Sequence, residues 1–333
     1  MIAERERWLN TYSEEPLDLA TPLCDPHHHL WDHPDSHYMP EDLVKDIDGH
    51  NVVKTVFVEC GAIYRHEGPR EMKPVGETEF VQAIAGQGAR GPHGPIAIAA
   101  GIVGFAYLLL GQAVEPVLEA HIAAGRGNLR GIRHTCAWDA SPDIASYRSP
   151  PPGQLLDPKF REGLSCLKKY NLSFDAWLYF HQLMELVDAA RALPDIPIIL
   201  NHTGGIIHVG PYAGRHDEVI QQWRKGMAAL AACPNVFVKL GGLGTPRCGF
   251  AWHKRPTPPG SAELAQAMSP YFLYCIEKFG PSRCMFESNF PVDRVSYSYG
   301  VMWNAFKRIA AAFSPDEQAD LLYNTAVRAY RLE

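Results

Sequence analysis

The chain has 333 residues, of which 46% are hydrophobic and 20% are charged, and its formal net charge is −6. This composition is that of a globular protein with a large core, and the acidic balance gives no reason to expect nucleic-acid binding. The first 18 residues are polar and lack the apolar segment of a signal peptide, and no long apolar run predicts a membrane span. We therefore expect a cytoplasmic protein that binds neither nucleic acid nor a membrane.

The cysteines support this localisation. Eight cysteines occur without a CxxC motif or a regular spacing, and several of them lie inside apolar segments. Such cysteines are typical of reduced core residues rather than of disulfides.

β-rich segments recur along the chain, and each is followed by a helical pattern. These segments are residues 22–29, 52–60, 95–104, 129–138, 172–180, 196–204, 235–243 and 282–291. Near-continuous apolar segments that alternate with helices indicate buried parallel strands. The clearest helical patterns span residues 182–193 and 261–279, and a capping box at Ser314 opens the last helix.

Eight βα units predict an α/β protein with a (β/α)8 TIM barrel as its single domain. We place this barrel at residues 21–333, after an arm of residues 1–20 that covers the bottom of the barrel or a neighbouring molecule. The alternative is a doubly wound open sheet, which is weakened because no GxGxxG motif follows the first strand. The oligomeric state stays open, and a homo-oligomer is one possibility.

Three consecutive histidines end the first predicted strand. Because side chains alternate along a strand, His27 and His29 share one face, and His28 points to the helical layer. Two imidazoles on one face form half of a metal site, or a site that binds an anion or polarises a carbonyl. Asp25 shares their face and either orients a histidine or contacts the substrate.

Polar side chains gather at the C-terminal ends of the other predicted strands. They are Glu59, Arg133, His134, Asp139, Asn201, His202, Lys239, Glu287, Ser288 and Asn289. Buried charges are rare unless they are paired or functional, and this end of a barrel carries the active site. Only one of Arg133 and His134 faces the interior, and we favour Arg133 because a guanidinium suits a carboxylate.

Two loops carry further candidates for substrate binding. Residues 245–260 contain Arg247 and Trp252 among several basic residues and no acid, and Tyr64 follows the second strand. The first loop is either a solvated basic segment or a lid that attracts an anionic substrate.

In order along the chain, five of these motifs resemble the amidohydrolase-2 family, close to its branch of sugar lactonases and 2-pyrone-4,6-dicarboxylate lactonases. They are Asp-x-His-x-His-x-Trp, Gly-Ile-Arg-His, Asn-His-x-Gly, Val-x-x-Lys-Leu and Ser-Asn-Phe-Pro, and the resemblance covers about residues 21–332. It implies a hydrolase that adds water to a lactone or a similar acyl bond. It also implies that His27, His29 and His202 bind one divalent metal, expected to be zinc, or contact the substrate in a metal-free enzyme.

The chain departs from the family pattern at Asn289, where relatives have the aspartate that acts as general base, and also has Asn201 where aspartate is common. Asparagine cannot accept a proton at neutral pH. Another carboxylate can take the role, with Glu287 as the first candidate and Asp293 and Glu59 as others. Alternatively, a metal-bound water needs no strong base, or the chain is not a hydrolase.

The resulting hypothesis is a hydrolase acting on a small, carboxylate-bearing lactone or similar substrate. We assign Glu287, Asn289, Arg133 and Lys239 to catalysis, His134, Arg247, Tyr64 and Trp252 to substrate binding, and His27, His29, His202 and Glu59 to the metal. Lys239 is alternatively one half of an ion pair inside the barrel, and Glu59 a base or a salt-bridge partner. The other functions that remain open are a metal-dependent decarboxylase of an aromatic or unsaturated carboxylic acid and a silent barrel that binds small anions.

Overall fold

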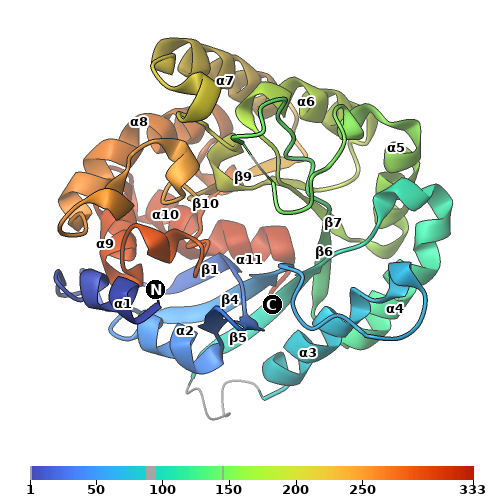
Figure 1. The fold of residues 1–333 in the computed structure, drawn as a ribbon, viewed down its shortest axis with the longest axis horizontal. Helices are drawn as coiled ribbons and strands as arrows, with labels where there is room; N and C mark the ends of the chain where they lie inside the picture. The colour runs from blue at the N-terminus through green and yellow to red at the C-terminus, as the bar shows by residue number, and fades with distance from the viewer. Residues whose placement is uncertain (1, 88–94, 145) are drawn as a thin grey trace.

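The structure is a computed structural model that describes residues 2–87, 95–144 and 146–333. Its centre is a parallel sheet of eight strands in the order β1-β4-β5-β6-β7-β8-β9-β10 (Figure 1). Their bounds are β1 Leu23–His28, β4 Val52–Val58, β5 Ala97–Gly104, β6 Leu129–Arg133, β7 Ser173–Ala176, β8 Ile198–Leu200, β9 Val236–Leu240 and β10 Cys284–Phe286. All eight predicted strands are confirmed, in sequential order around the sheet.

The barrel closes where β1 meets the segment that follows β10. His28 and Phe290 form an isolated parallel bridge. The backbone N–H of Asn289 donates to the carbonyl of His27 at 2.9 Å, and that of His29 donates to the carbonyl of Phe290 at 2.8 Å. The closure therefore places the strand-one histidines beside the Ser-Asn-Phe-Pro motif.

The helices lie around the barrel, except that α11 (Thr325–Tyr330) crosses the barrel opening in this view (Figure 1). They are α1 Ile2–Leu9, α2 Pro40–Ile47, α3 Val75–Ala85, α4 Glu115–Gly125, α5 Pro158–Ser165, α6 Leu183–Ala192, α7 His216–Ala231, α8 Ser261–Phe279, α9 Tyr299–Ala310, α10 Pro315–Ala319 and α11 Thr325–Tyr330. The helices predicted at 182–193 and 261–279 correspond to α6 and α8, and the capping box at Ser314 opens α10. None of the described helices is long and apolar enough to cross a bilayer.

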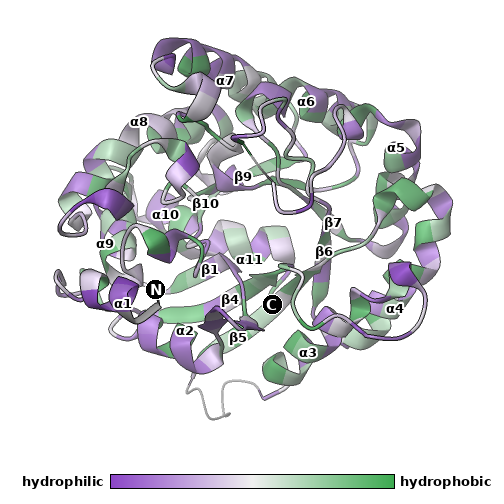
Figure 2. Cartoon of the chain, viewed as in Figure 1, coloured by the Kyte–Doolittle hydropathy of each residue, from purple (hydrophilic) through white to green (hydrophobic). Residues whose placement is uncertain are grey.

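Apolar side chains fill the barrel and the layer between barrel and helices, and Figure 2 shows the strands as mostly hydrophobic while the helices carry both kinds of residue. The interior cluster includes Val56, Val103, Ile199 and Met285 from the strands, and Tyr330 from α11 packs against them. All eight cysteines are free, and all but the half-buried Cys60 are fully buried.

The N-terminal arm runs along the side of the barrel. Its first helix, α1, lies at the C-terminal ends of the strands, and the arm then leads to β1. Near β1 the arm is bonded to α9, where the backbone N–H of Leu17 donates to Asn304 Oδ1 at 2.8 Å. Further up, Trp8 Nε1 donates to the carbonyl of Arg255 at 2.8 Å, in the loop that follows β9. The expectation that the arm covers the bottom of the barrel is therefore wrong, because α1 docks on the loops at the opposite end.

Candidate active site

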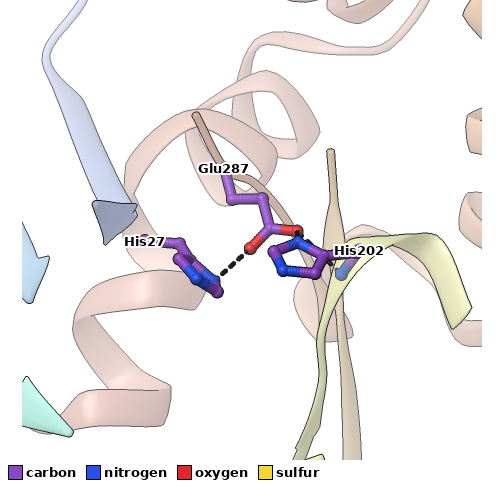
Figure 3. Close-up of side chains that lie close together, drawn as sticks. All are labelled: His27, His202 and Glu287. Atoms are coloured by element: carbon purple, nitrogen blue, oxygen red, sulfur yellow. Dashed lines mark hydrogen bonds and ion pairs between the residues drawn. The ribbon is translucent and has the colours of Figure 1, made fainter. Parts of the chain in front are cut away.

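Three fully or nearly fully buried side chains meet at the C-terminal end of the barrel: His27 from β1, His202 just after β8 and Glu287 just after β10. Glu287 lies between the two imidazoles (Figure 3). Its Oε1 accepts the backbone N–H and the Nδ1–H of His202, both at 2.8 Å, and its Oε2 lies 2.6 Å from His27 Nδ1. One potential ligand atom from each residue lies within 4.8 Å of the others, so the group could hold a metal ion.

His202 is aimed at this group by an unusual turn. The residue has φ +55°, and Thr203, Gly204 and Gly205 after it also have positive φ angles. Gly242, after β9, makes room for the turn, because a Cβ there would lie 2.4 Å from the Cβ of His202. The Asn-His-x-Gly motif thus ends the strand and turns the imidazole towards the barrel axis.

The three site histidines are neutral. Burial lowers the pKa of His27, His29 and His202 well below the usual 6.5, and the cations Arg133 and Lys239 lower the pKa of His27 and His202 further. His29 Nδ1 must donate to the carbonyl of Val58 at 2.7 Å, because a carbonyl oxygen only accepts. The Nε2 of His29 therefore carries a lone pair.

Two buried cations flank His27. Arg133 Nη1 lies 3.3 Å from His27 Nε2, and Lys239 Nζ lies 3.3 Å from His27 Nδ1. Lys239 is paired with Asp175 at 2.8 Å, and Asp175 also accepts from Tyr330 of α11 at 2.7 Å. Both cations can therefore stabilise negative charge beside the histidines.

Arg133 ends β6 and His134 follows it, and the structure shows which of the two side chains faces the barrel interior. Arg133 does, whereas the ring of His134 packs against Phe105 and Phe160 at centroid distances of 5.1 and 5.3 Å. Its Nδ1 accepts the backbone N–H of Leu108 at 3.2 Å. His134 lies in the layer outside the strands, which corrects the expectation that it binds substrate. His28 also points away from the site, and its Nε2 lies 2.8 Å from Thr55 Oγ1.

Glu59 belongs to a separate ionic cluster. Its carboxylate accepts from Arg133 Nε at 2.8 Å, from Arg148 Nη2 at 2.6 Å and from the hydroxyl of Tyr147. Burial raises its pKa, but the two guanidinium groups lower it to about 2. Because both of its oxygens are engaged, Glu59 is a salt-bridge partner. We expected Glu59 to lie with the metal-ligating histidines, but the carboxylate beside His27 and His202 is that of Glu287.

No sequence motif pointed to Tyr147 and Arg148. They lie in the long irregular segment between β6 and α5 and reach back over the barrel mouth to Glu59. Arg148 also donates to the hydroxyl of Tyr64 at 2.6 Å, so the predicted substrate residue Tyr64 is tied into this cluster. Only the length of the loop pointed to a role, because long loops at this end of a barrel are commonly functional.

His29 lies beside the group of His27, His202 and Glu287 rather than within it. Its ring centroid is 5.0 Å from that of His27. Asp25 supports the closure behind both histidines, since its Oδ1 accepts the backbone N–H groups of His27 at 3.2 Å and Ser288 at 3.0 Å. Of the two roles expected for Asp25, the structure therefore supports the orienting one.

Asn289 is held by a buried carboxylate. Its Nδ2 donates to Asp293 Oδ1 at 2.8 Å, while Asp293 Oδ2 accepts from the Gly244 backbone at 2.9 Å and from Tyr297 at 2.7 Å. Burial raises the pKa of Asp293 to about 7 and that of Glu287 also to about 7. The amide of Asn289 is thus oriented by Asp293, and Glu287 is the carboxylate that contacts the histidines.

The loop after β9 contains two residues predicted to bind substrate, Arg247 and Trp252, and only Arg247 lies near the site. The Arg247 guanidinium lies over Trp177 at 5.2 Å, and the edge of Trp177 packs on His202 at 4.6 Å. Trp252 instead stacks on Phe250 at 4.3 Å and is only 3% exposed. Trp252 therefore anchors the loop, which corrects its expected contact with substrate.

Comparisons with known proteins agree with this architecture. The family model described as amidohydrolase matches residues 24–332. The uncharacterized protein y4mH of Sinorhizobium fredii is 32% identical over 332 residues, covering 93% of this chain and 98% of the relative. The L-fucono-1,5-lactonase of Burkholderia multivorans is 29% identical over 220 residues, covering 65% of this chain and 68% of the relative.

A solved amidohydrolase from Burkholderia multivorans with bound zinc superposes with a TM-score of 0.71 at 23% identity, covering 94% of this chain and 100% of that one. This likeness confirms the TIM-barrel fold. The family match over residues 24–332 shows that the chain belongs to the amidohydrolase family and is a hydrolase.

Proposed function

We propose that this protein hydrolyses a lactone of a small, carboxylate-bearing acid. The observation that carries the proposal is the position of Glu287, whose carboxylate lies between His27 and His202 with two buried cations beside it. A carboxylate to move a proton, imidazoles to orient the substrate and cations to stabilise an oxyanion are what acyl hydrolysis requires. The lactonase activity named for relatives supports the same reaction.

In this proposal Glu287 accepts the proton of the attacking water at Oε2. This oxygen is buried and lies 2.6 Å from His27 Nδ1, whereas Oε1 accepts two hydrogen bonds from His202. Arg133 and Lys239 stabilise the negative charge that develops on the acyl oxygen. Arg247, which lies over Trp177 at the edge of the site, attracts the carboxylate of the substrate.

The same residues fit a divalent metal. Burial favours the neutral form of His27 and His202, Glu287 is a buried carboxylate between them, and nitrogen and carboxylate donors suit zinc. We infer that His27, His202 and one oxygen of Glu287 would hold the ion, which leaves the other oxygen of Glu287 to accept a proton. When bound, such a metal polarises an acyl oxygen and lowers the pKa of a water molecule.

Two measurements test these proposals. The purified protein is assayed for acid release from L-fucono-1,5-lactone and a panel of carboxylate-bearing lactones, and for CO2 release from aromatic carboxylic acids. Acid release is expected, whereas CO2 release alone would replace the lactonase by a decarboxylase. Metal content is measured by mass spectrometry, and a stoichiometric ion that is lost in His202→Ala but kept in His134→Ala is expected. A wild-type protein that hydrolyses lactones without metal would refute the metal assignment.

A further inference from the structure

We propose that a cavity beside the catalytic group binds a flat carboxylate-bearing ring and makes α1 part of the substrate site. The cavity has a volume of about 600 Å³. It lies between α1, the hairpin of β2 (Trp31–His33) and β3 (Ser36–Tyr38), and the segments that follow β9 and β10. The inference rests on the proposed function only in assigning the bound ring to the substrate.

The cavity borders the active site through a single aromatic ring. Trp31 lines the cavity, and its indole stacks on His29 with a centroid distance of 5.9 Å and an interplanar angle of 21°. The wall that follows β10 is formed by Pro291, Arg294 and Val295, which directly flank Asp293 and its partner Asn289. A molecule in the cavity is therefore a near neighbour of the residues proposed for catalysis.

Two tryptophans give the cavity apolar surface suited to a ring. The Nε1–H of Trp8 donates to the carbonyl of Arg255 at 2.8 Å, and that of Trp31 donates to Ser36 Oγ at 2.9 Å. Both polar atoms are engaged within the protein, and neighbours cover part of each ring: the Arg5 guanidinium lies 4.6 Å over Trp8, and Trp31 stacks on His29 and His33. What the indoles offer a ligand is the apolar and aromatic surface that these neighbours leave uncovered. Planar rings pack well on such surfaces.

Two arginines from different elements supply positive charge. Arg294 comes from the segment after β10, and its nearest carboxylates are those of Asp46 at 3.5 Å and Glu6 at 3.6 Å. Arg5 of α1 donates to the carbonyl of His253 at 3.4 Å. These distances are longer than the 2.7–2.9 Å of a strong charge-assisted bond, so both guanidinium groups retain donors for a carboxylate.

Glu6 and Asp46, which lie near Arg294, are not among the residues that line the cavity. Glu4 is the carboxylate residue among those that line it, and its side chain is exposed to solvent. A guanidinium binds a carboxylate with two parallel hydrogen bonds. The combination of Trp8, Trp31, Arg5 and Arg294 therefore selects a ring that carries a carboxylate over a neutral ring of the same shape.

Isophthalate is a stable probe for this chemistry, and isophthalamide is its neutral counterpart. Binding of both is measured by calorimetry and tryptophan fluorescence on the full chain. We expect isophthalate to bind and isophthalamide to bind at least about tenfold more weakly, since hydrogen bonds to charged groups carry the difference. Arg5→Ala and Arg294→Gln should each raise the Kd for isophthalate about tenfold.

The matched control is Arg7→Ala, which removes the same charge from α1 at an exposed position that does not line the cavity. It should leave the Kd unchanged. If Arg5→Ala releases α1, detected by proteolysis near Trp8, then Arg294→Gln in the segment after β10 provides the test. Equal affinity for the two probes, an unchanged Kd in Arg294→Gln, or equal losses in Arg7→Ala and Arg5→Ala would overturn the proposal.

Binding does not depend on turnover, so it separates this inference from the proposed function. Loss of isophthalate binding in His202→Ala, with full binding in Arg5→Ala and Arg294→Gln, would place the probe at the catalytic group and refute the cavity site. A protein that binds isophthalate through Arg5 and Arg294 but hydrolyses no lactone refutes only the proposed function. A lactonase whose KM for carboxylate-bearing lactones is the same in both arginine variants refutes only the role of the cavity.

Discussion

Glu59 and Glu287 are both fully buried carboxylates at the C-terminal end of the barrel, yet their surroundings move the pKa in opposite directions. Glu59 contacts two guanidinium groups and a phenol, which lower its pKa to about 2 despite burial. Glu287 contacts two neutral imidazoles, and burial raises its pKa to about 7. The comparison indicates that the two carboxylates have different roles. Near β4 and β6, Glu59 is part of a fixed ionic scaffold, whereas near β8 and β10 Glu287 is the reactive carboxylate.

The largest effect is expected from Glu287→Gln. Glutamine has a similar shape but cannot take a proton, so lactone hydrolysis should fall by about 10²- to 10⁴-fold. Activity is measured at saturating substrate, and circular dichroism checks that the fold is kept. Glu263→Gln is the control, because Glu263 is an exposed partner of Arg255 in the nearby loop. Undiminished hydrolysis in Glu287→Gln would remove Glu287 from the reaction.

Glu59→Gln should act on stability instead. The substitution leaves the buried guanidinium of Arg133 without its carboxylate, which typically costs about 3–5 kcal/mol. The free energy of unfolding is measured by urea titration. The control Glu79→Gln removes an exposed pair with Arg65 and should cost less than about 1 kcal/mol. Equal costs in the two variants would show that the ionic scaffold does not stabilise the fold.

Asn289→Asp tests whether the site lacks a base. The new carboxylate would face Asp293 across the present 2.8 Å contact, so we expect no gain in hydrolysis and a loss of about 1–3 kcal/mol in stability. The double variant Asn289→Asp with Asp293→Asn restores one donor and one acceptor and should recover the stability. A large gain in hydrolysis by the single variant would mean that Glu287 is not an effective base.

Much of this comparison was predictable from the sequence, because side chains alternate along strands. Alternation predicted the face of each side chain, positions at the C-terminal ends of the predicted strands placed His27, Arg133 and Glu287 at one end of the barrel, and the charge of Arg133 correctly favoured it over His134. Contacts between distant loops could not be predicted in this way. Arg148 reaches Glu59 across 89 residues and Trp8 reaches Arg255 across 247 residues. Neither contact leaves a periodic pattern, so the roles of Glu59 and α1 required the structure.

The smallest expected effect is a change, at acidic pH, in the difference in unfolding free energy between the wild type and Glu59→Gln. Because the folded pKa of Glu59 is lowered to about 2 from a usual 4.5, its ion pairs stabilise the fold fully above pH 4.5. This contribution is lost as the pH falls from 4.5 towards 2, since the carboxylate is then protonated in both states. The gap in unfolding free energy between the wild type and Glu59→Gln should therefore narrow over this range, measured by urea titration at several pH values. A gap that stays constant to pH 2 would show that packing, rather than charge, makes Glu59 important.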